Sequence, residues 1–294
     1  MAKSSRSYEV VVVAYKSREP LTKFLENLGS GVPVIVVDNS VEIDDLTDLA
    51  QRFENVRCID AGGNLGFSAG ANLGARHSNA EHLVFMNPDT LPSESALSQM
   101  VAVLEESSTV ASCGAAGVGT AGGGAQPTIG RVLAHSLGLH RLFPMIGIYY
   151  VPKHEERVDV DWVSGSCLAI GRAEFEAVGG FDESYFVFMS DFDLGRKLSL
   201  EGRSQRLLGD VTVPHFVGGS SDIPSEWTWN QRGKGWAQYI RRTMTRGRGF
   251  AIATLLVIGY AGRIVIYTAA RRTVKADEVA TYSRSLLTEW RRSS

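Results

Sequence analysis

The chain has 294 residues, of which 21% are charged, and its formal net charge is −2. This length permits one large domain or two modest ones. The near-neutral charge excludes a general nucleic-acid-binding protein, which would carry a marked excess of Lys and Arg. Three scattered cysteines without a Cys-x-x-Cys pair indicate neither a zinc cluster nor a disulfide framework, and they fit a reducing cytosol. The N-terminus shows no signal-peptide core.

Strands and helices alternate through the first third of the chain. Apolar runs rich in β-branched residues predict buried strands at Val10–Val13, Val34–Val37, Val56–Ile59 and His82–Met86. Helices are predicted at Pro20–Leu28, Asp44–Phe53 and Ser93–Leu104, and a further helix opens within Gly62–Gly70 and continues to about His77. This alternation predicts a mostly parallel sheet with right-handed crossovers.

Polar residues follow the predicted strands, at the edge where open α/β sheets bind ligands. Asp38 ends the second strand, where a carboxylate can accept hydrogen bonds from a nucleoside base or a ribose hydroxyl, or can cap a helix. Asn64 and its neighbouring glycines would bring backbone N–H groups close to a ligand at a helix start, or form a plain turn.

The Asn87-Pro88-Asp89 segment places a carboxylate directly after a buried strand, in a turn stiffened by proline. Such an Asp can anchor a hard divalent cation to a diphosphate, or it can simply stabilise the turn. His215 ends a predicted strand at Val211–His215. A lone histidine is usually structural, but one that ends a strand in a domain with Asp89 could complete the metal shell.

The middle of the chain has a different composition. Gly114–Ala125 is glycine-rich and is expected to be a mobile loop. Val158–Ile170 is predicted to form strands, and it contains Trp162 and Gly165. A short helix is predicted at Arg172–Val178.

Two acidic residues, Asp191 and Asp193, flank an aromatic residue at the start of a predicted helix that ends at Leu200. A carboxylate in this position can act as a general base on an incoming hydroxyl. Acids at this spacing are also common on protein surfaces, so the pair alone does not decide between a catalytic and a structural function.

The composition changes again from about Glu226. A basic, predicted helical stretch is followed by an apolar one, Phe250–Ala270, which contains Arg263 and is followed by further basic residues. This apolar stretch is only marginally long enough to span a bilayer, and both of its flanks are basic. It can lie along an anionic membrane surface, span the membrane or form a buried core helix; we expect the first.

Taken together and in this order, these segments resemble the family 2 glycosyltransferases with the GT-A fold. The resemblance is strongest to bacterial rhamnosyltransferase-like members that build cell-wall polysaccharide, and it spans roughly Tyr8–Ser221. The stretches that carry it are Val10–Tyr15, Val36–Ser40, Asn64–Gly70, Asn87–Asp89, Trp162–Leu168, Gly179–Asp182, Asp191–Asp193 and His215–Ser220. It implies an α/β GT-A catalytic domain over residues 1–225, with a mostly parallel central sheet flanked by helices. The basic and apolar composition of the following residues predicts a helical, membrane-associated tail over residues 226–294.

The resemblance also implies functions for individual residues. Asp191 matches the catalytic base, and Asp89 and His215 match the residues that hold a divalent cation, Mg²⁺ or Mn²⁺. The implied donor-binding residues are Ala14, Tyr15, Asp38, Asn64, Asn87, Asp89, Trp162 and Gly165.

The sequence departs from the family pattern at two positions. Asn87 replaces the first acid of the family's Asp-x-Asp motif, and an amide is a weaker metal ligand than a carboxylate. Ser190 replaces the acid that usually precedes the base, so a like-charged neighbour is not expected to raise the pKa of Asp191.

The implied reaction is inverting transfer of a sugar, in this branch rhamnose, from a dTDP- or UDP-linked donor to a hydroxyl of a lipid-linked or polysaccharide acceptor in cell-envelope glycan synthesis. The enzyme would be cytoplasmic and peripheral to the cytoplasmic face of the cell membrane, attached to an anionic surface by its C-terminal tail. No nucleic acid is expected as a partner.

Other classes of protein share parts of this pattern. A Rossmann oxidoreductase would also use Asp38, but it needs a glycine fingerprint after the first strand, where Ala14–Arg18 has no glycine. A nucleotidyltransferase acting on sugar phosphates would need a glycine-rich basic loop at the same place. A non-catalytic membrane-associated scaffold with the same fold is the remaining alternative, and the retained Asp89, Asp191 and His215 count against it.

Overall fold

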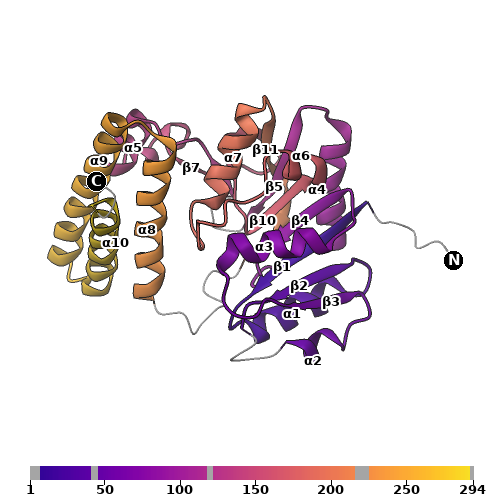
Figure 1. The fold of residues 1–294 in the computed structure, drawn as a ribbon. Helices are drawn as coiled ribbons and strands as arrows, with labels where there is room; N and C mark the ends of the chain where they lie inside the picture. Colours follow the sequence, from indigo (N-terminus) through magenta and orange to yellow (C-terminus); the bar gives the residue numbers. More distant parts are fainter. Residues whose placement is uncertain (1–6, 41–45, 118–121, 216–224, 292–294) are drawn as a thin grey trace. The chain divides into compact units, whose positions relative to one another are not determined.

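The computed structural model describes residues 7–40, 46–117, 122–215 and 225–291 (Figure 1). The chain forms two compact units. The first unit comprises Met1–Gly124, Val151–Ser184 and Ser190–Asp222, and the second comprises Ala125–Tyr150, Tyr185–Met189 and Ile223–Ser294.

The first unit contains an eight-stranded sheet in the order β3-β2-β1-β4-β10-β5-β11-β8. Its strands are β1 (Tyr8–Ala14), β2 (Val34–Asp38), β3 (Val56–Asp60), β4 (His82–Met86), β5 (Val110–Gly117), β8 (Arg157–Val160), β10 (Cys167–Gly171) and β11 (Ser204–Val213). β1, β2, β3 and β4 pair in parallel, as do β5 and β11, whereas β10 and β8 run antiparallel to their neighbours. Two short strands, β6 (Gly123–Gly124) and β9 (Trp162–Val163), pair antiparallel outside this sheet.

The helices of this unit are α1 (Arg18–Leu28), α2 (Thr47–Ala50), α3 (Gly66–His77), α4 (Glu94–Glu106), α6 (Arg172–Ala177) and α7 (Ser190–Leu200). The periodic apolar residues that predicted α1 are its buried face: Leu21, Phe24, Leu25 and Leu28. Ser93 caps α4, because its hydroxyl accepts a hydrogen bond from the Ala96 N–H at 3.1 Å.

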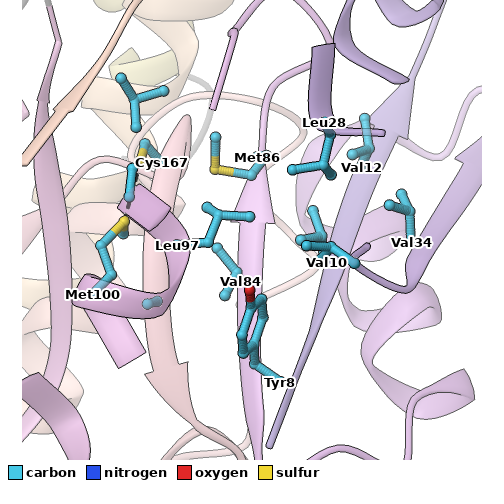
Figure 2. Close-up of a cluster of buried hydrophobic side chains, with 14 of the residues drawn as sticks. Tyr8, Val10, Val12, Leu28, Val34, Val84, Met86, Leu97, Met100 and Cys167 are labelled. Atoms are coloured by element: carbon cyan, nitrogen blue, oxygen red, sulfur yellow. Dashed lines mark hydrogen bonds between the residues drawn. The ribbon is translucent and has the colours of Figure 1, made fainter. Parts of the chain in front are cut away.

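The continuous apolar run of β1 is explained by burial on both faces of the strand. Val10 and Val12 point into a core with residues of α1 and α4 (Figure 2). Val11 points to the other face, where α3 packs so closely that a Cβ atom at Gly74 would overlap the Val11 side chain. A strand covered on both faces needs no polar residue. This burial and the parallel pairing of β1 with β2 and β4 confirm the prediction of a central parallel strand.

The four predicted strands of the first third are confirmed, and the predicted helix at Asp44–Phe53 is shorter, since only Thr47–Ala50 is helical. Residues 41–45 lie outside the described part.

The prediction of a mobile loop at Gly114–Ala125 is wrong for half of that segment. Residues 114–117 end β5 and residues 123–124 form β6, while residues 118–121 are outside the described part. The glycines permit close packing rather than mobility. A Cβ at Gly114 would overlap Val163, and one at Gly123 would overlap the Trp162 carbonyl.

The second unit is mainly helical. Its elements are α5 (Ile129–Ser136), the 3₁₀ helices η1 (Leu139–Arg141) and η2 (Pro144–Ile146), the short strand β7 (Tyr149–Tyr150), and the helices α8 (Ser225–Thr243), α9 (Arg246–Ala269) and α10 (Thr273–Arg291). α10 packs against both α8 and α9, and α5 packs against α9. The helical character expected of the tail is confirmed, whereas the helices at residues 129–146 were not predicted.

The core of the first unit predicts a large difference between two leucine substitutions. Leu97 is fully buried in α4 (Figure 2), whereas Leu200 at the end of α7 is 72% exposed. Leu97→Ala should lower the free energy of unfolding by about 2–5 kcal/mol, because it leaves a cavity, and Leu200→Ala should change it by less than about 0.5 kcal/mol. Denaturant unfolding of both variants measures the difference, and equal midpoints would contradict this description of the core.

Candidate functional site

Asp89 and His215, which are 126 positions apart, are brought together by the ends of β4 and β11. Thr90 forms an antiparallel bridge with His215, and the Leu91 N–H donates to the Pro214 carbonyl at 2.9 Å. This backbone pairing places Asp89 Oδ1 3.1 Å from His215 Nε2. Both side chains are largely buried, with 9% and 14% of their surface exposed.

The turn that carries Asp89 is fixed by its own backbone. The Asn87 carbonyl accepts hydrogen bonds from the Thr90 N–H at 3.3 Å and the Thr90 hydroxyl at 2.7 Å. The Asn87 N–H donates to the Ser166 carbonyl at 3.0 Å, which ties the end of β4 to the segment before β10. These hydrogen bonds hold the backbone that carries the Asp89 carboxylate in one conformation.

The spacing of Asp89 and His215 fits a shared divalent cation. Two ligands at ~2.1 Å on adjacent octahedral positions lie ~3.0 Å apart, close to the observed separation of Asp89 Oδ1 and His215 Nε2. Within the described residues, no group of three His, Cys, Asp or Glu side chains is placed to hold an ion. The pair therefore suits a cation such as Mg²⁺ or Mn²⁺, which keeps waters and substrate phosphate oxygens as its other ligands.

Asp191 lies in the first turn of α7, next to two other predicted site residues. Its carboxylate accepts a hydrogen bond from the Phe192 N–H at 3.0 Å and another from the backbone of Gly165. The Phe192 ring stacks on Trp162 with ring centroids 3.9 Å apart. Gly195 lets α7 approach β9, because a Cβ at that position would overlap Trp162. Trp162, Gly165 and Asp191 thus form one packed group.

Burial raises the pKa of Asp191 from its usual 3.8 to about 6, although the hydrogen bonds from Phe192 and Gly165 oppose the shift. Ser190, which directly precedes it and stands where the resemblance implies an acid, is itself buried. The pKa of Asp191 is therefore raised by desolvation. A neighbouring acid is not needed for this shift.

Asp193 has a different environment from Asp191. It is buried, and its carboxylate forms ion pairs with Arg196 at 3.0 Å and Lys197 at 3.1 Å. These partners lie on the same helix, so Asp193 stabilises α7 and is committed to that structural function.

One short segment, Ser164–Ser166, connects the two parts of the site. Gly165 donates to the Asp191 carboxylate, and the Ser166 carbonyl accepts from Asn87 in the turn that carries Asp89. The structure therefore brings Asp89, His215 and Asp191 to the same edge of the first unit.

Asp38 is almost fully buried and organises its own loop. Its Oδ1 atom accepts hydrogen bonds from the Ser40 N–H at 2.8 Å and the Ser40 hydroxyl at 2.9 Å, and Oδ2 accepts from the Leu46 N–H at 2.8 Å. These bonds give the carboxylate a structural function at the end of β2. Its predicted contact with a nucleotide stays a prediction.

The loops after β1 and β2 and the start of α3 are joined through Asn39. Its N–H donates to the Ala14 carbonyl at 2.9 Å, and its side chain donates to the Gly66 carbonyl at 3.0 Å. Asn64 is exposed, and its Oδ1 accepts from the Gly66 N–H at 3.0 Å. Ala14, Asp38 and Asn64 therefore lie close to one another. Tyr15, the residue after β1, is partly buried.

Sequence reasoning assigned no function to several residues that shape this site. Phe67 lies over Gly165 so closely that a Cβ there would overlap the ring. All four of these residues lie within the stretches that carry the family resemblance: Asn39, Phe67, Ser166 and Phe192. Membership in those stretches was the only sequence feature that could have pointed to them, because their contacts depend on the tertiary fold.

Comparison with known proteins identifies the family of this chain. The model of glycosyl transferase family 2 matches residues 9–166, which is more than half of the chain. An N-acetylglucosaminyl-diphospho-decaprenol L-rhamnosyltransferase of Mycobacterium tuberculosis is 30% identical over 222 residues, covering 66% of this chain and 70% of that protein. The rhamnosyltransferase WbbL of Escherichia coli is 25% identical over 220 residues, covering 66% of this chain and 77% of that protein.

The fold also has a counterpart among solved structures. The mannosyltransferase PcManGT from Pyrobaculum calidifontis, in complex with GDP-Man and Mn²⁺, matches with a TM-score of 0.59 and 16% identity, covering 96% of this chain and 87% of that one. The comparisons confirm the GT-A fold and lend no support to an oxidoreductase or a non-catalytic scaffold. The chain belongs to glycosyl transferase family 2, among its rhamnosyltransferase-like members.

Proposed function

We propose that this glycosyltransferase moves a sugar, rhamnose, from a dTDP- or UDP-linked donor to a hydroxyl of a lipid-linked or polysaccharide acceptor, with inversion at the anomeric carbon. The observation that carries the proposal is the joining of the Asp89–His215 pair to the Asp191 carboxylate through Ser164–Ser166. The names of two relatives, both rhamnosyltransferases, support the choice of sugar, and the decaprenol diphosphate in one name supports a lipid-linked acceptor.

Asp191 would act as the base. With a pKa of about 6 it is largely ionised near neutral pH, yet it is basic enough to take a proton from an acceptor hydroxyl in the transition state. The hydroxyl oxygen attacks the anomeric carbon from the face opposite the diphosphate, so the bond to the donor breaks as the new glycosidic bond forms. Asp193, paired with Arg196 and Lys197, supplies no second free carboxylate as a nucleophile.

Asp89 and His215 would hold a Mg²⁺ or Mn²⁺ ion, which when bound supplies charge neutralisation for the departing diphosphate. The stiff turn at Asn87 keeps the Asp89 carboxylate in place. The loops that carry Ala14, Asp38 and Asn64 would surround the nucleotide, and Trp162 and Gly165 would line the path between donor and acceptor. Catalysis would then come mainly from positioning and electrostatics.

The enzyme would work at the cytoplasmic face of the membrane as a peripheral protein, because a lipid-linked acceptor lies there. The basic and apolar helices after residue 225 support this location.

Replacing the proposed base should separate binding from transfer. Asp191→Asn should lower kcat by ~10²–10⁴-fold, because no group remains to take the hydroxyl proton, while nucleotide-diphosphate binding stays unchanged. Asp159→Asn removes an exposed carboxylate that pairs with Arg206 and serves as the control. Sugar-transfer assays and calorimetric titration measure the two properties, and near-normal turnover by Asp191→Asn would show that the base is misassigned.

The raised pKa of Asp191 predicts a pH-dependent stability effect. In the wild type, burial of the charge lowers stability as pH rises from 3.8 through about 6. Asp191→Asn should therefore be more stable than the wild type by roughly 2–3 kcal/mol well above that range, and the gain should vanish at or below a pH of about 4. Denaturant unfolding across this range tests the sign, and an equal gain at all pH values would exclude desolvation as its cause.

The cation site can be tested through binding as well as activity. A nucleoside diphosphate bound with Mn²⁺ should raise the melting temperature of the wild type. From this thermal stabilisation, Asp89→Asn and His215→Ala should each show an apparent affinity about tenfold or more weaker. His154→Ala, at an exposed histidine, is the control and should behave as the wild type. Chelation of the metal should abolish transfer, and normal Mn²⁺ dependence in both site variants would place the cation elsewhere.

A further inference from the structure

The segment from α5 to β7 (residues 129–150) exposes an unusual number of large apolar side chains. Leu142 and Phe143 are 73% and 61% exposed. They are accompanied by Leu133, Leu137, Leu139, Met145 and Ile146, all of which are at least 40% exposed. Scattered exposed leucines are ordinary, but so many within one short segment indicate a binding surface.

This segment is attached to α9, which has an exposed apolar face of its own. The Ser136 hydroxyl donates to the Leu255 carbonyl at 3.0 Å, and Arg263 donates to the His135 carbonyl at 2.9 Å. Gly259 makes the approach possible, because a Cβ there would overlap Ser136. The exposed large apolar residues of α9 are Phe250, Ile258, Val265 and Ile266.

The charged residues of the two segments are all basic. Residues 125–150 and 246–275 contain no Asp or Glu, although these acids make up 32 of the 294 residues. The same segments carry Arg131, Arg141, Arg246, Arg248, Arg263, Arg271, Arg272 and Lys275. The next acids, Asp277 and Glu278, lie within α10. Apolar side chains surrounded by basic ones complement an anionic lipid surface.

The two histidines of the segment add no charge near neutral pH. His135 and His140 stack with ring centroids 4.4 Å apart. Burial lowers the pKa of His135 to about 3, with a further contribution from Arg263, and burial also lowers the pKa of His140. Nothing in this pair therefore opposes contact with lipid.

The contacts of α9 favour a helix that lies on a membrane over one that crosses it. By length and composition α9 could span, with 24 residues and a mean hydropathy of 1.9 over its most apolar part. However, Ile252, Ala253 and Leu256 are buried in the second unit, and Arg263 is tied to α5. A spanning helix would place this arginine in the bilayer core, which is unfavourable.

We propose that α5, η1, η2 and α9 together form one docking surface for an anionic phospholipid bilayer, with the side chains around Leu142 and Phe143 entering the lipid. Membrane contact thereby extends from the C-terminal tail to a segment far upstream. Basic side chains such as Arg141 and Arg271 would contact the lipid headgroups. The proposal is independent of the sugar, the donor and the catalytic residues.

Vesicle cosedimentation of the full chain tests the proposal. The wild type should bind phosphatidylglycerol vesicles much better than phosphatidylcholine vesicles. The double variants Leu142→Ser/Phe143→Ser and Val265→Ser/Ile266→Ser should each lower partitioning by about tenfold or more. Val151→Ser/Leu200→Ser, at two exposed apolar positions of the first unit, is the matched control and should bind as the wild type.

Charge variants and folding controls complete the experiment. Arg271→Glu/Arg272→Glu should weaken binding to phosphatidylglycerol by about tenfold, whereas Lys153→Glu in the first unit should not. Thermal melting checks that each variant folds. If the Leu142/Phe143 variant does not fold, Arg141→Glu replaces it and should weaken binding several-fold.

Three outcomes would overturn the proposal. Wild-type vesicle binding by the folded Leu142/Phe143 or Arg141 variant would restrict the membrane contact to the tail. Wild-type protein that resists extraction from vesicles by high salt and alkali would indicate a spanning α9. A wild-type dimer that the Leu142/Phe143 variant converts to a monomer, with unchanged vesicle binding, would assign the surface to a second copy of the chain.

Discussion

The backbone bridge between Thr90 and His215 is the constraint on which the site depends. It joins the end of a central parallel strand to the end of β11, across two intervening strands of the sheet. Thr90 and Leu91, which follow Asp89, pair with His215 and Pro214, so this backbone contact brings the Asp89 carboxylate close to the His215 imidazole. Backbone pairing thus supports the 3.1 Å contact between the two side chains.

The two acids at the start of α7 show how environment separates similar residues. Asp193 is neutralised by Arg196 and Lys197 on its own helix. Asp191, two positions earlier, accepts backbone hydrogen bonds instead, and burial raises its pKa to about 6. Spacing along the sequence cannot distinguish these functions, because the packing of Trp162 and Gly165 against α7 determines which carboxylate stays available.

Sequence patterns predicted the first unit well where burial produces a simple periodicity. β1 is covered on both faces and reads as an uninterrupted apolar run, and the turn Asn87–Asp89 follows such a strand. The pattern failed at Gly114 and Gly123, because a glycine chosen for close packing looks the same in sequence as one chosen for flexibility. It also gave no indication that residues 125–150 cluster with the C-terminal helices, since such contacts are set by tertiary structure.

The covering of Gly165 by Phe67 has a consequence for how the proposed path between donor and acceptor can change in this protein. A larger residue at Gly165 would require the Phe67 ring to move. Phe67, by contrast, is only partly buried and touches Phe181 edge-on. A smaller residue at position 67 would open space above Gly165, so divergence or engineering can change this wall most directly through the aromatic ring.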